Sequence, residues 1–104
     1  MASLIKELRT IVDKDDDHIC TDMFEKLPSK KLYPDYFVLI SNPIAIDTIM
    51  KKAKKKGYQS LDEVKEDLET MYTNAKFYNE KGSWVYNDAD SLKSFSDKWF
   101  KTNQ

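Results

Sequence analysis

The amino-acid sequence predicts an all-α fold, a small bundle of four helices with one long loop, and two observations lead to this prediction. Charged residues make up 34% of the 104 residues and there are only two glycines, a balance typical of solvated helices rather than of a β sandwich. Apolar residues recur at three- and four-residue intervals in four segments, the spacing that places side chains on one helix face. A chain of this length holds one hydrophobic core, so we expect a single domain over residues 1–104, with its core over about 4–100.

The first helix is expected in two parts. Apolar residues at helical spacing come before and after an acidic interruption at 13–17, and Pro28 ends the pattern because proline has no amide hydrogen to donate. The apolar positions are Leu4, Ile5, Leu8, Ile11 and Val12, then Ile19, Cys20, Met23, Phe24 and Leu27. A bent or split helix is therefore predicted for residues 4–27.

Residues 26–41 show no sustained helical repeat, although many of them are apolar or aromatic. The two prolines of this stretch, Pro28 and Pro34, lie among Leu32, Tyr33, Tyr36 and Phe37. Long loops without regular structure are uncommon in small domains and usually serve a function. We therefore expect this loop to form part of a binding site.

The second helix is expected to begin at Asn42-Pro43, because asparagine is a good N-cap residue and proline suits the first helical position. Its buried face consists of Ile46, Ile49, Met50 and Ala53. Five lysines between positions 51 and 56 fall in its last turns, where cations complement the helix dipole. Gly57 follows, and we expect it to end the helix in the left-handed conformation that glycine adopts readily.

The third helix opens at Ser60, which with Glu63 fits the capping-box pattern. Its apolar face is expected to consist of Leu61, Val64, Leu68, Met71, Tyr72, Ala75 and Tyr78. A short break at 80–83 leads to the fourth helix. The apolar face of that helix is expected at Val85, Ala89, Leu92, Phe95, Trp99 and Phe100.

Asn79 is the most informative residue, because it lies four positions after Ala75 and so continues the buried face of the third helix with a polar amide. A buried amide without a partner costs about 1–3 kcal/mol, so Asn79 needs a partner from the protein or from a ligand. Asparagine near a helix end is commonly a C-terminal cap, and this interpretation stays open beside ligand binding.

Aromatic and aliphatic residues from the long loop and from both sides of Asn79 predict an apolar pocket. They are Leu27, Tyr33, Tyr36, Phe37, Tyr78, Trp84, Val85 and Tyr86. One amide donor within an apolar wall suits a neutral ligand that presents a carbonyl on an aliphatic stem, and acetyl-lysine fits that description. An unmodified lysine would bring its ammonium into the same site, where desolvating a charge is costly. Acidic residues near the wall are expected to favour basic tails. They are Asp35, Glu80, Asp88 and Asp90.

Four motifs, in order and at the right spacing, resemble those of the bromodomain family, and the resemblance extends from the first helix to about Phe100. The motifs are Tyr33-Pro34-Asp35-Tyr36-Phe37, Asn42-Pro43-Ile44, Asn74-Ala75-Lys76-Phe77-Tyr78-Asn79 and Val85-Tyr86. The resemblance implies a left-handed four-helix bundle of helices Z, A, B and C, with the ZA and BC loops forming the pocket mouth. It also implies that Asn79 donates to the acetyl carbonyl, that Tyr36 bonds the same carbonyl through a water, and that Val85 is the gatekeeper.

The start of the long loop departs from many bromodomains, which have a Trp-Pro-Phe shelf there. Residues 24–29 read Phe-Glu-Lys-Leu-Pro-Ser, and with the stretch at 78–86 they resemble the C-terminal bromodomain of yeast SWI/SNF- and RSC-type chromatin-remodelling ATPases, the RSC catalytic subunit especially. The resemblance implies a nuclear module that binds acetylated histone tails, or another acetylated protein, and holds a remodelling complex on nucleosomes. We expect the chain to be a piece of a larger remodelling protein, to meet other subunits through it, and to be monomeric by itself.

Two other binding functions stay open. The lysine run at 51–56 allows a weak, salt-dependent contact with nucleosomal DNA, or a structural role that needs no acetylation, although acidic residues at 62–67 offset part of its charge. The aromatic residues of the predicted pocket also allow a methyl-lysine cage. Such a cage has no use for the inward amide of Asn79, so acetylated and trimethylated peptides would separate these two interpretations.

We expect no catalysis, cofactor, metal site or membrane partner. A single histidine, His18, and a single cysteine, Cys20, leave few ways to build a nucleophile with its base, and they do not furnish a structural zinc site. No apolar run approaches the roughly 20 residues of a membrane span. The net charge of −1 indicates neither a polycation for nucleic acid nor an acidic tail.

Overall fold

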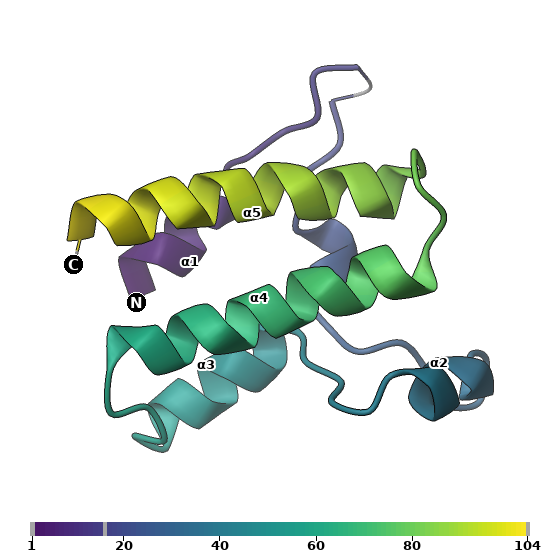
Figure 1. Cartoon of the computed structure of the whole chain (residues 1–104), viewed down its shortest axis with the longest axis horizontal. Coiled ribbons are helices and arrows are strands. Elements are labelled where there is room, and N and C mark those ends of the chain that lie inside the picture. The colour runs from purple at the N-terminus through teal and green to yellow at the C-terminus, as the bar shows by residue number, and fades with distance from the viewer. Residues whose placement is uncertain (1, 16, 104) are drawn as a thin grey trace.

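The computed structural model describes residues 2–15 and 17–103; Met1, Asp16 and Gln104, which the predictions above include, lie outside the described residues. Two long helices, α4 (Leu61–Tyr78) and α5 (Trp84–Asn103), lie side by side through the molecule (Figure 1). The shorter α1 (Ala2–Leu8) packs against α5, and α3 (Ile46–Lys54) contributes side chains to the same core. The predicted all-α bundle of four helices is confirmed, and no strand occurs within the described residues.

The core follows the apolar faces that helical spacing predicts. It contains Leu4, Ile5 and Leu8 from α1, Ile46 and Ile49 from α3, Val64, Leu68, Met71, Tyr72 and Ala75 from α4, and Ala89, Leu92 and Phe100 from α5. The phenol of Tyr72 is buried among them, and its hydroxyl shares a hydrogen bond of 2.7 Å with the Ser96 hydroxyl of α5. None of the helices within residues 2–15 and 17–103 combines the length and the apolarity that crossing a membrane requires.

The predicted first helix is wrong beyond Leu8. The helix ends there, an isolated antiparallel bridge joins Val12 to Ile19, and the second part is only the 3-10 helix η1 (Asp22–Phe24). The acidic interruption explains the difference, because the Asp13 carboxylate accepts a hydrogen bond of 2.7 Å from the Asp15 amide, a local bond that competes with helix formation. The apolar residues between Ile11 and Leu27 therefore lie mostly in turns and extended chain, and not in an α-helix.

The long loop contains one further short helix, α2 (Pro34–Leu39), which begins with proline at its first position. None of its residues is buried. Helix α3 begins at Ile46, with Ala45 as its N-cap, and not at Asn42-Pro43 as predicted. The Asn42 carbonyl instead accepts a hydrogen bond of 2.9 Å from the Asn74 side chain, which fixes the approach to α3 against α4.

Two further predictions concern helix ends. The residue with left-handed backbone after α3 is Lys56, at φ 58°, and not Gly57. Gly57 is needed for a different reason, because a Cβ there would lie 2.7 Å from the Cγ atom and 3.0 Å from the carbonyl oxygen of Lys52. The Ser60 cap of α4 is confirmed: its hydroxyl accepts from the Glu63 amide at 3.4 Å, while the Glu63 carboxylate accepts from the amide of Gln59 at 2.6 Å.

Candidate functional site

A cavity of about 480 Å³ opens where the long loop meets the end of α4 and the start of α5. This volume is within the range of small-ligand pockets. The cavity is lined by Asp22, Met23, Phe24, Glu25, Lys26, Leu27, Pro28, Tyr33, Tyr36, Ile44, Ala45, Met71, Ala75, Tyr78, Asn79 and Val85. Most of these side chains are apolar or aromatic, so the cavity suits an apolar ligand with few polar atoms.

Asn79 lies at the wall of this cavity as the C-cap residue of α4. Its backbone amide and its side-chain Nδ2 both donate to the Ala75 carbonyl, at 3.0 and 2.9 Å. A side-chain amide carries two hydrogens and an acceptor oxygen. Within the described residues Nδ2 uses one hydrogen at the helix end, so the other hydrogen remains for a ligand. Capping and ligand binding are therefore compatible at Asn79.

Tyr36 and Tyr78 form an aromatic corner beside Asn79. Their rings meet edge to face, with centroids 4.9 Å apart at an angle of 76°. The Tyr78 hydroxyl donates to the Asp35 carboxylate, 3.1 Å from each oxygen. Burial raises the pKa of Tyr36, so its hydroxyl keeps its proton to higher pH than an exposed tyrosine does. The cavity wall therefore offers a neutral phenol as a second polar group.

Val85 completes the predicted trio around the cavity, from the first turn of α5. The predicted wall residues Leu27, Tyr33 and Tyr78 also line it. The structure thus brings these six side chains, from the long loop, the end of α4 and the start of α5, to one cavity. This placement rests on the loop folding back over α4.

Three predicted wall residues do not line the cavity. Phe37 packs against Tyr36 and lies under the ammonium of Lys30, whose Nζ is 5.2 Å from the ring centroid. Trp84 and Tyr86 flank Val85 on α5, and successive helical residues point about 100° apart, so both turn away when Val85 faces inward. Trp84 and Tyr86 were assigned to the wall because they neighbour Val85 in the sequence, although the predicted apolar face of this helix includes neither of them.

The sequence interpretation also missed part of the lining. Phe24, Ile44, Ala45, Met71 and Ala75 belong to the core and also line the cavity. The spacing of Met71, Ala75 and Asn79 contained a signal, because residues four apart share one helix face. Ile44 and Ala45 follow no helical repeat, so nothing in the spacing marked them.

The predicted acidic surroundings are only partly available to a basic peptide. Asp88 is 2% exposed and its carboxylate is paired with His18, so it does not face a bound tail. Asp90 forms an ion pair of 2.5 Å with Lys76, and Asp35 accepts from Tyr78. Glu80 is exposed beside Asn79. The prediction that all four favour basic tails is therefore wrong for Asp88, because burial removes it from the surface.

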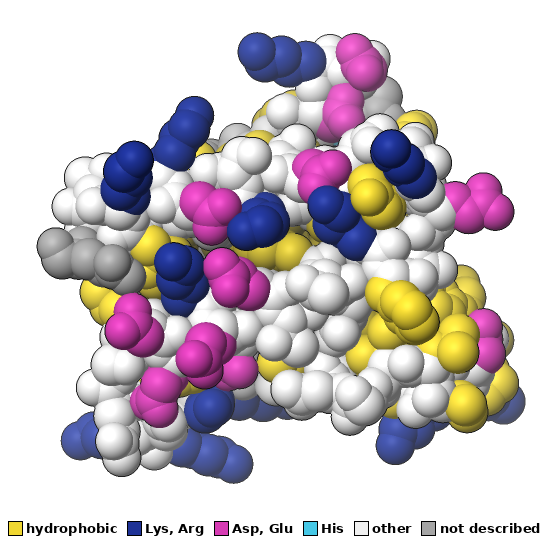
Figure 2. Space-filling view, viewed as in Figure 1, with side chains coloured by type: hydrophobic (Ala, Val, Ile, Leu, Met, Phe, Trp, Pro, Cys, Tyr) yellow, Lys and Arg dark blue, Asp and Glu magenta, His cyan; other side chains and the backbone are white. Residues whose placement is uncertain are grey.

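An apolar surface adjoins the cavity. Figure 2 shows hydrophobic side chains gathered over α2 and the nearby end of α4. The exposed members are Leu32, Tyr33, Val38, Leu39 and Phe77. Tyr33 belongs both to this surface and to the cavity lining. A peptide that enters the cavity would therefore have apolar side chains beside its flanking residues.

The lysine run at the end of α3 is partly neutralised within the chain. Lys51 pairs with Asp47 at 3.1 Å, and Lys52 pairs with Asp67 at 3.5 Å while lying 4.5 Å above the ring centroid of Tyr58. The other three lysines, at 54–56, are exposed. The field of this run is therefore weaker than five adjacent cations suggest.

Comparison with known proteins gives a consistent result. The family model described as Bromodomain matches residues 8–91. Over 98 residues the chain is 55% identical to the nuclear protein STH1/NPS1 of Saccharomyces cerevisiae, a match of 94% of this chain and 7% of that protein. It is 45% identical over 83 residues to the chromatin structure-remodeling complex subunit snf21 of Schizosaccharomyces pombe, covering 80% of this chain and 7% of that protein. The structure of the bromodomain from human BAZ1A superposes with a TM-score of 0.77 at 31% identity, covering 89% of this chain and 80% of that one.

Proposed function

This chain belongs to the bromodomain family, and from that premise we propose that it binds acetylated lysine on histone tails or on other acetylated proteins. The resemblance to bromodomains of chromatin-remodelling proteins that the motifs predict is confirmed. Bromodomains are binding modules, and no catalytic role is proposed for these residues. The chain spans only 7% of the length of each of the two fungal relatives.

The observation that carries this proposal is the position of Asn79 in an apolar cavity with one amide hydrogen still available. The acetyl carbonyl would accept that hydrogen, and the Tyr36 hydroxyl would reach the same oxygen through a water. Val85, at the start of α5, would contact the acetyl group as gatekeeper. An unacetylated lysine would bring an ammonium into a mostly apolar cavity, where its desolvation disfavours binding. Of the two carboxylates in the lining, Glu25 is already paired with Arg9.

The proposed biological role follows from the relatives. Proteins described as a nuclear protein and as subunits of chromatin-remodelling complexes contain a similar segment. We infer that this chain is a nuclear module that helps a remodelling complex stay on acetylated nucleosomes, with other subunits reached through the remainder of its protein. A single mark would be bound at micromolar to millimolar affinity, about −4 to −8 kcal/mol, so retention would depend on several weak contacts acting together.

A module that contacts DNA without regard to acetylation receives less support. Two of the five lysines of the run are held in ion pairs with Asp47 and Asp67. A methyl-lysine cage is also less supported, because Trp84 and Tyr86 do not line the cavity that holds Asn79. The acetyl-lysine reader is therefore the function that the cavity supports best.

The test is a heteronuclear NMR titration with one histone-tail peptide in unmodified, acetylated and trimethylated forms. We expect shifts at Tyr36, Asn79 and Val85 with the acetylated peptide only. Asn79→Phe, which fills the cavity, should abolish them, while the control Asn87→Phe on the exposed side of α5 should leave them unchanged. Equal responses to all three peptides would overturn the proposal.

A further inference from the structure

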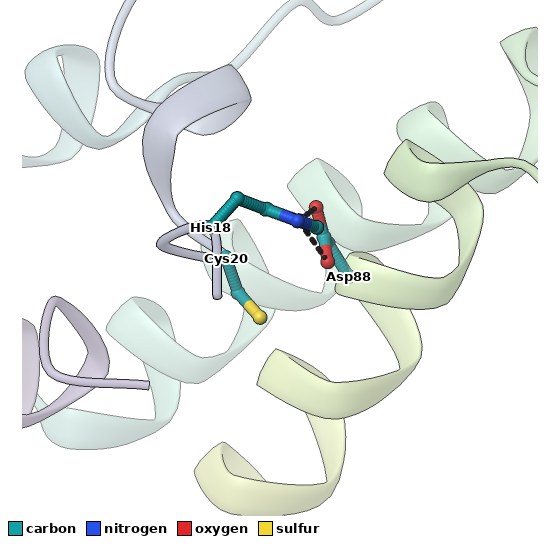
Figure 3. A group of neighbouring side chains, drawn as sticks. All are labelled: His18, Cys20 and Asp88. Atoms are coloured by element: carbon teal, nitrogen blue, oxygen red, sulfur yellow. Dashed lines mark hydrogen bonds and ion pairs between the residues drawn. The ribbon is translucent and has the colours of Figure 1, made fainter. Parts of the chain in front are cut away.

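Three side chains of metal-binding types meet at a second place in the molecule. They are His18 and Cys20 from the segment before η1 and Asp88 from α5 (Figure 3). Their potential ligand atoms all lie within 4.8 Å of one another, although His18 and Asp88 are 70 positions apart in the sequence. We propose that these three residues form a binding site for Zn²⁺.

The backbone around His18 and Cys20 is fixed before any metal binds. The Val12–Ile19 bridge holds this segment in an antiparallel pair. On either side of Ile19, the His18 carbonyl accepts from the Asp13 amide at 2.8 Å, and the Cys20 amide donates to the Ile11 carbonyl at 2.9 Å. In extended chain, residues two apart point to the same side, so His18 and Cys20 both reach toward α5.

The imidazole of His18 is oriented as a ligand would be. Its Nε2 lies 2.9 and 2.7 Å from the two carboxylate oxygens of Asp88. Its ring stacks on Trp84, with centroids 5.0 Å apart and planes 14° from parallel. Trp84 and Asp88 are four residues apart on α5 and thus share one helix face. The same helix face therefore fixes the ring plane and presents the carboxylate to Nε2.

Burial makes this group suitable for a cation. Asp88 is 2% exposed and Cys20 is 1% exposed, whereas the His18 side chain is 20% exposed. Ions would therefore enter from the His18 side. A thiolate and a carboxylate would carry two negative charges in a site of low polarity, and one divalent cation would balance them. Binding would release the thiol proton, because a cysteine ligand must be deprotonated, and Zn²⁺ at Nε2 of His18 would require the neutral ring tautomer that carries its proton on Nδ1.

The mixed donor set selects the metal. One nitrogen, one sulfur and one oxygen suit Zn²⁺, which binds such ligands in a tetrahedron, whereas Mg²⁺ and Ca²⁺ prefer oxygen alone. Ligand atoms around one tetrahedral Zn²⁺ lie about 3.3–3.7 Å apart at the usual bond lengths. The observed spacing therefore needs side-chain shifts on the order of an ångström, and a water would take the fourth position.

This site departs from the sequence-based expectation that a single histidine and a single cysteine furnish no zinc site. The fold supplies the third ligand, Asp88, from a helix far along the chain. Bound Zn²⁺ would tie the segment at 12–20 to the start of α5, whose first turn carries Val85 of the cavity. The proposal does not depend on the acetyl-lysine function, since it rests on a different set of residues.

The test is a titration of the metal-free chain with zinc chloride. Calorimetry measures Zn²⁺ binding, and thermal unfolding measures its effect on stability. We expect one Zn²⁺ per chain, a release of protons, and a melting temperature that rises with Zn²⁺ concentration. Cobalt chloride serves as the spectroscopic probe, because a Cys20–Co²⁺ bond would give a thiolate-to-metal absorption band. No saturable binding of Zn²⁺ to the wild-type chain would overturn the proposal.

Variants locate the ion. Cys20→Ser and Asp88→Asn should each weaken Zn²⁺ binding by more than about 100-fold, since losing a second-shell partner alone costs about 10–100-fold. Cys20→Ser should also abolish the cobalt band. Asp90→Asn is the matched control, because Asp90 lies on the same helix but pairs with Lys76 at the surface. If Asp88→Asn does not fold, Cys20→Ser still decides, and unchanged Zn²⁺ affinity in that variant would place the ion elsewhere.

Discussion

The middle and the end of α4 both turn a polar group inward, but they treat it differently. In the middle, the Tyr72 hydroxyl is fully buried and shares a hydrogen bond of 2.7 Å with Ser96. At the end, the Asn79 amide gives one hydrogen to the Ala75 carbonyl, and Asn79 also lines the cavity. A buried polar group satisfied within the protein is part of the core, whereas one that keeps bonding capacity beside a cavity is a candidate site.

The largest expected effect is a loss of folding stability from a substitution in the middle of α4, with no matching loss of peptide binding at its end. Leu68, in the middle of α4, is fully buried in the core and does not line the cavity. Leu68→Ala should lower the free energy of unfolding by about 2–5 kcal/mol, because it removes apolar contacts and leaves a void. Urea unfolding measures this loss. The affinity of the folded fraction for acetylated peptide should stay within about twofold of wild type, given that binding depends on the end of the helix. A large loss of affinity in the folded protein would contradict the separation.

The second prediction concerns Asn79, where we expect a large loss of peptide affinity and only a small loss of stability, the reverse of Leu68→Ala. Asn79→Ala should weaken binding of an acetylated histone peptide by about 1–3 kcal/mol, roughly 5- to 150-fold, because the acetyl carbonyl loses its donor. Stability should fall by only about 0.5–1.5 kcal/mol, the contribution of the bond to Ala75. Calorimetry and urea unfolding measure both quantities. Asn87→Ala, which removes an exposed amide bonded to the Gly82 carbonyl, is the control and should leave peptide affinity unchanged.

The same contrast explains how far the sequence could predict this structure. The bounds and buried face of α4 were predictable because an N-cap, a helical repeat and a break all coincide in one segment. The first helix was not, because the spacing from Ile11 to Leu27 is compatible with turns once aspartates bond the local backbone. The spacing in this segment also failed to identify the buried residues, because of its apolar residues only Cys20 and Phe24 are buried, whereas Val12, Ile19, Met23 and Leu27 are exposed.

The candidate site was predictable where one helix or a motif carried it. Asn79 followed from the repeat on α4, and Tyr36 and Val85 followed from motifs that resemble the bromodomain family. The repeat predicted the apolar face of α5 with Val85 on it. Trp84 and Tyr86 were assigned to the wall only because they flank Val85 in the sequence, although they do not line the cavity. The pairing of His18 with Asp88 depends on a contact 70 positions apart, which no local pattern encodes.

A smaller effect tests whether the Tyr72 hydroxyl is structural only. Tyr72→Phe leaves the buried Ser96 hydroxyl without this partner and should lower stability by about 1–2 kcal/mol. Adding Ser96→Ala to that variant should recover part of the loss, because no polar atom of the pair remains. Thermal and urea unfolding of both variants measure the difference. Peptide affinity should not change in either, and a weakened affinity would show that the middle of α4 also contributes to binding.

The smallest expected effect tests whether a buried polar group without a partner indicates a binding site even where there is no cavity. The Thr21 hydroxyl is buried and has no hydrogen-bond partner among the described residues, yet Thr21 does not line the cavity. If a cavity is also required, this hydroxyl is only a cost, and Thr21→Val should raise the free energy of unfolding by about 1 kcal/mol. Thr10→Val, at an exposed hydroxyl that donates to the Glu7 carbonyl, is the control and should not stabilise the protein. A destabilised Thr21→Val variant would mean that the Thr21 hydroxyl has a hydrogen-bond partner in solution. Thr21 would then resemble Tyr72, whose buried hydroxyl is satisfied within the protein.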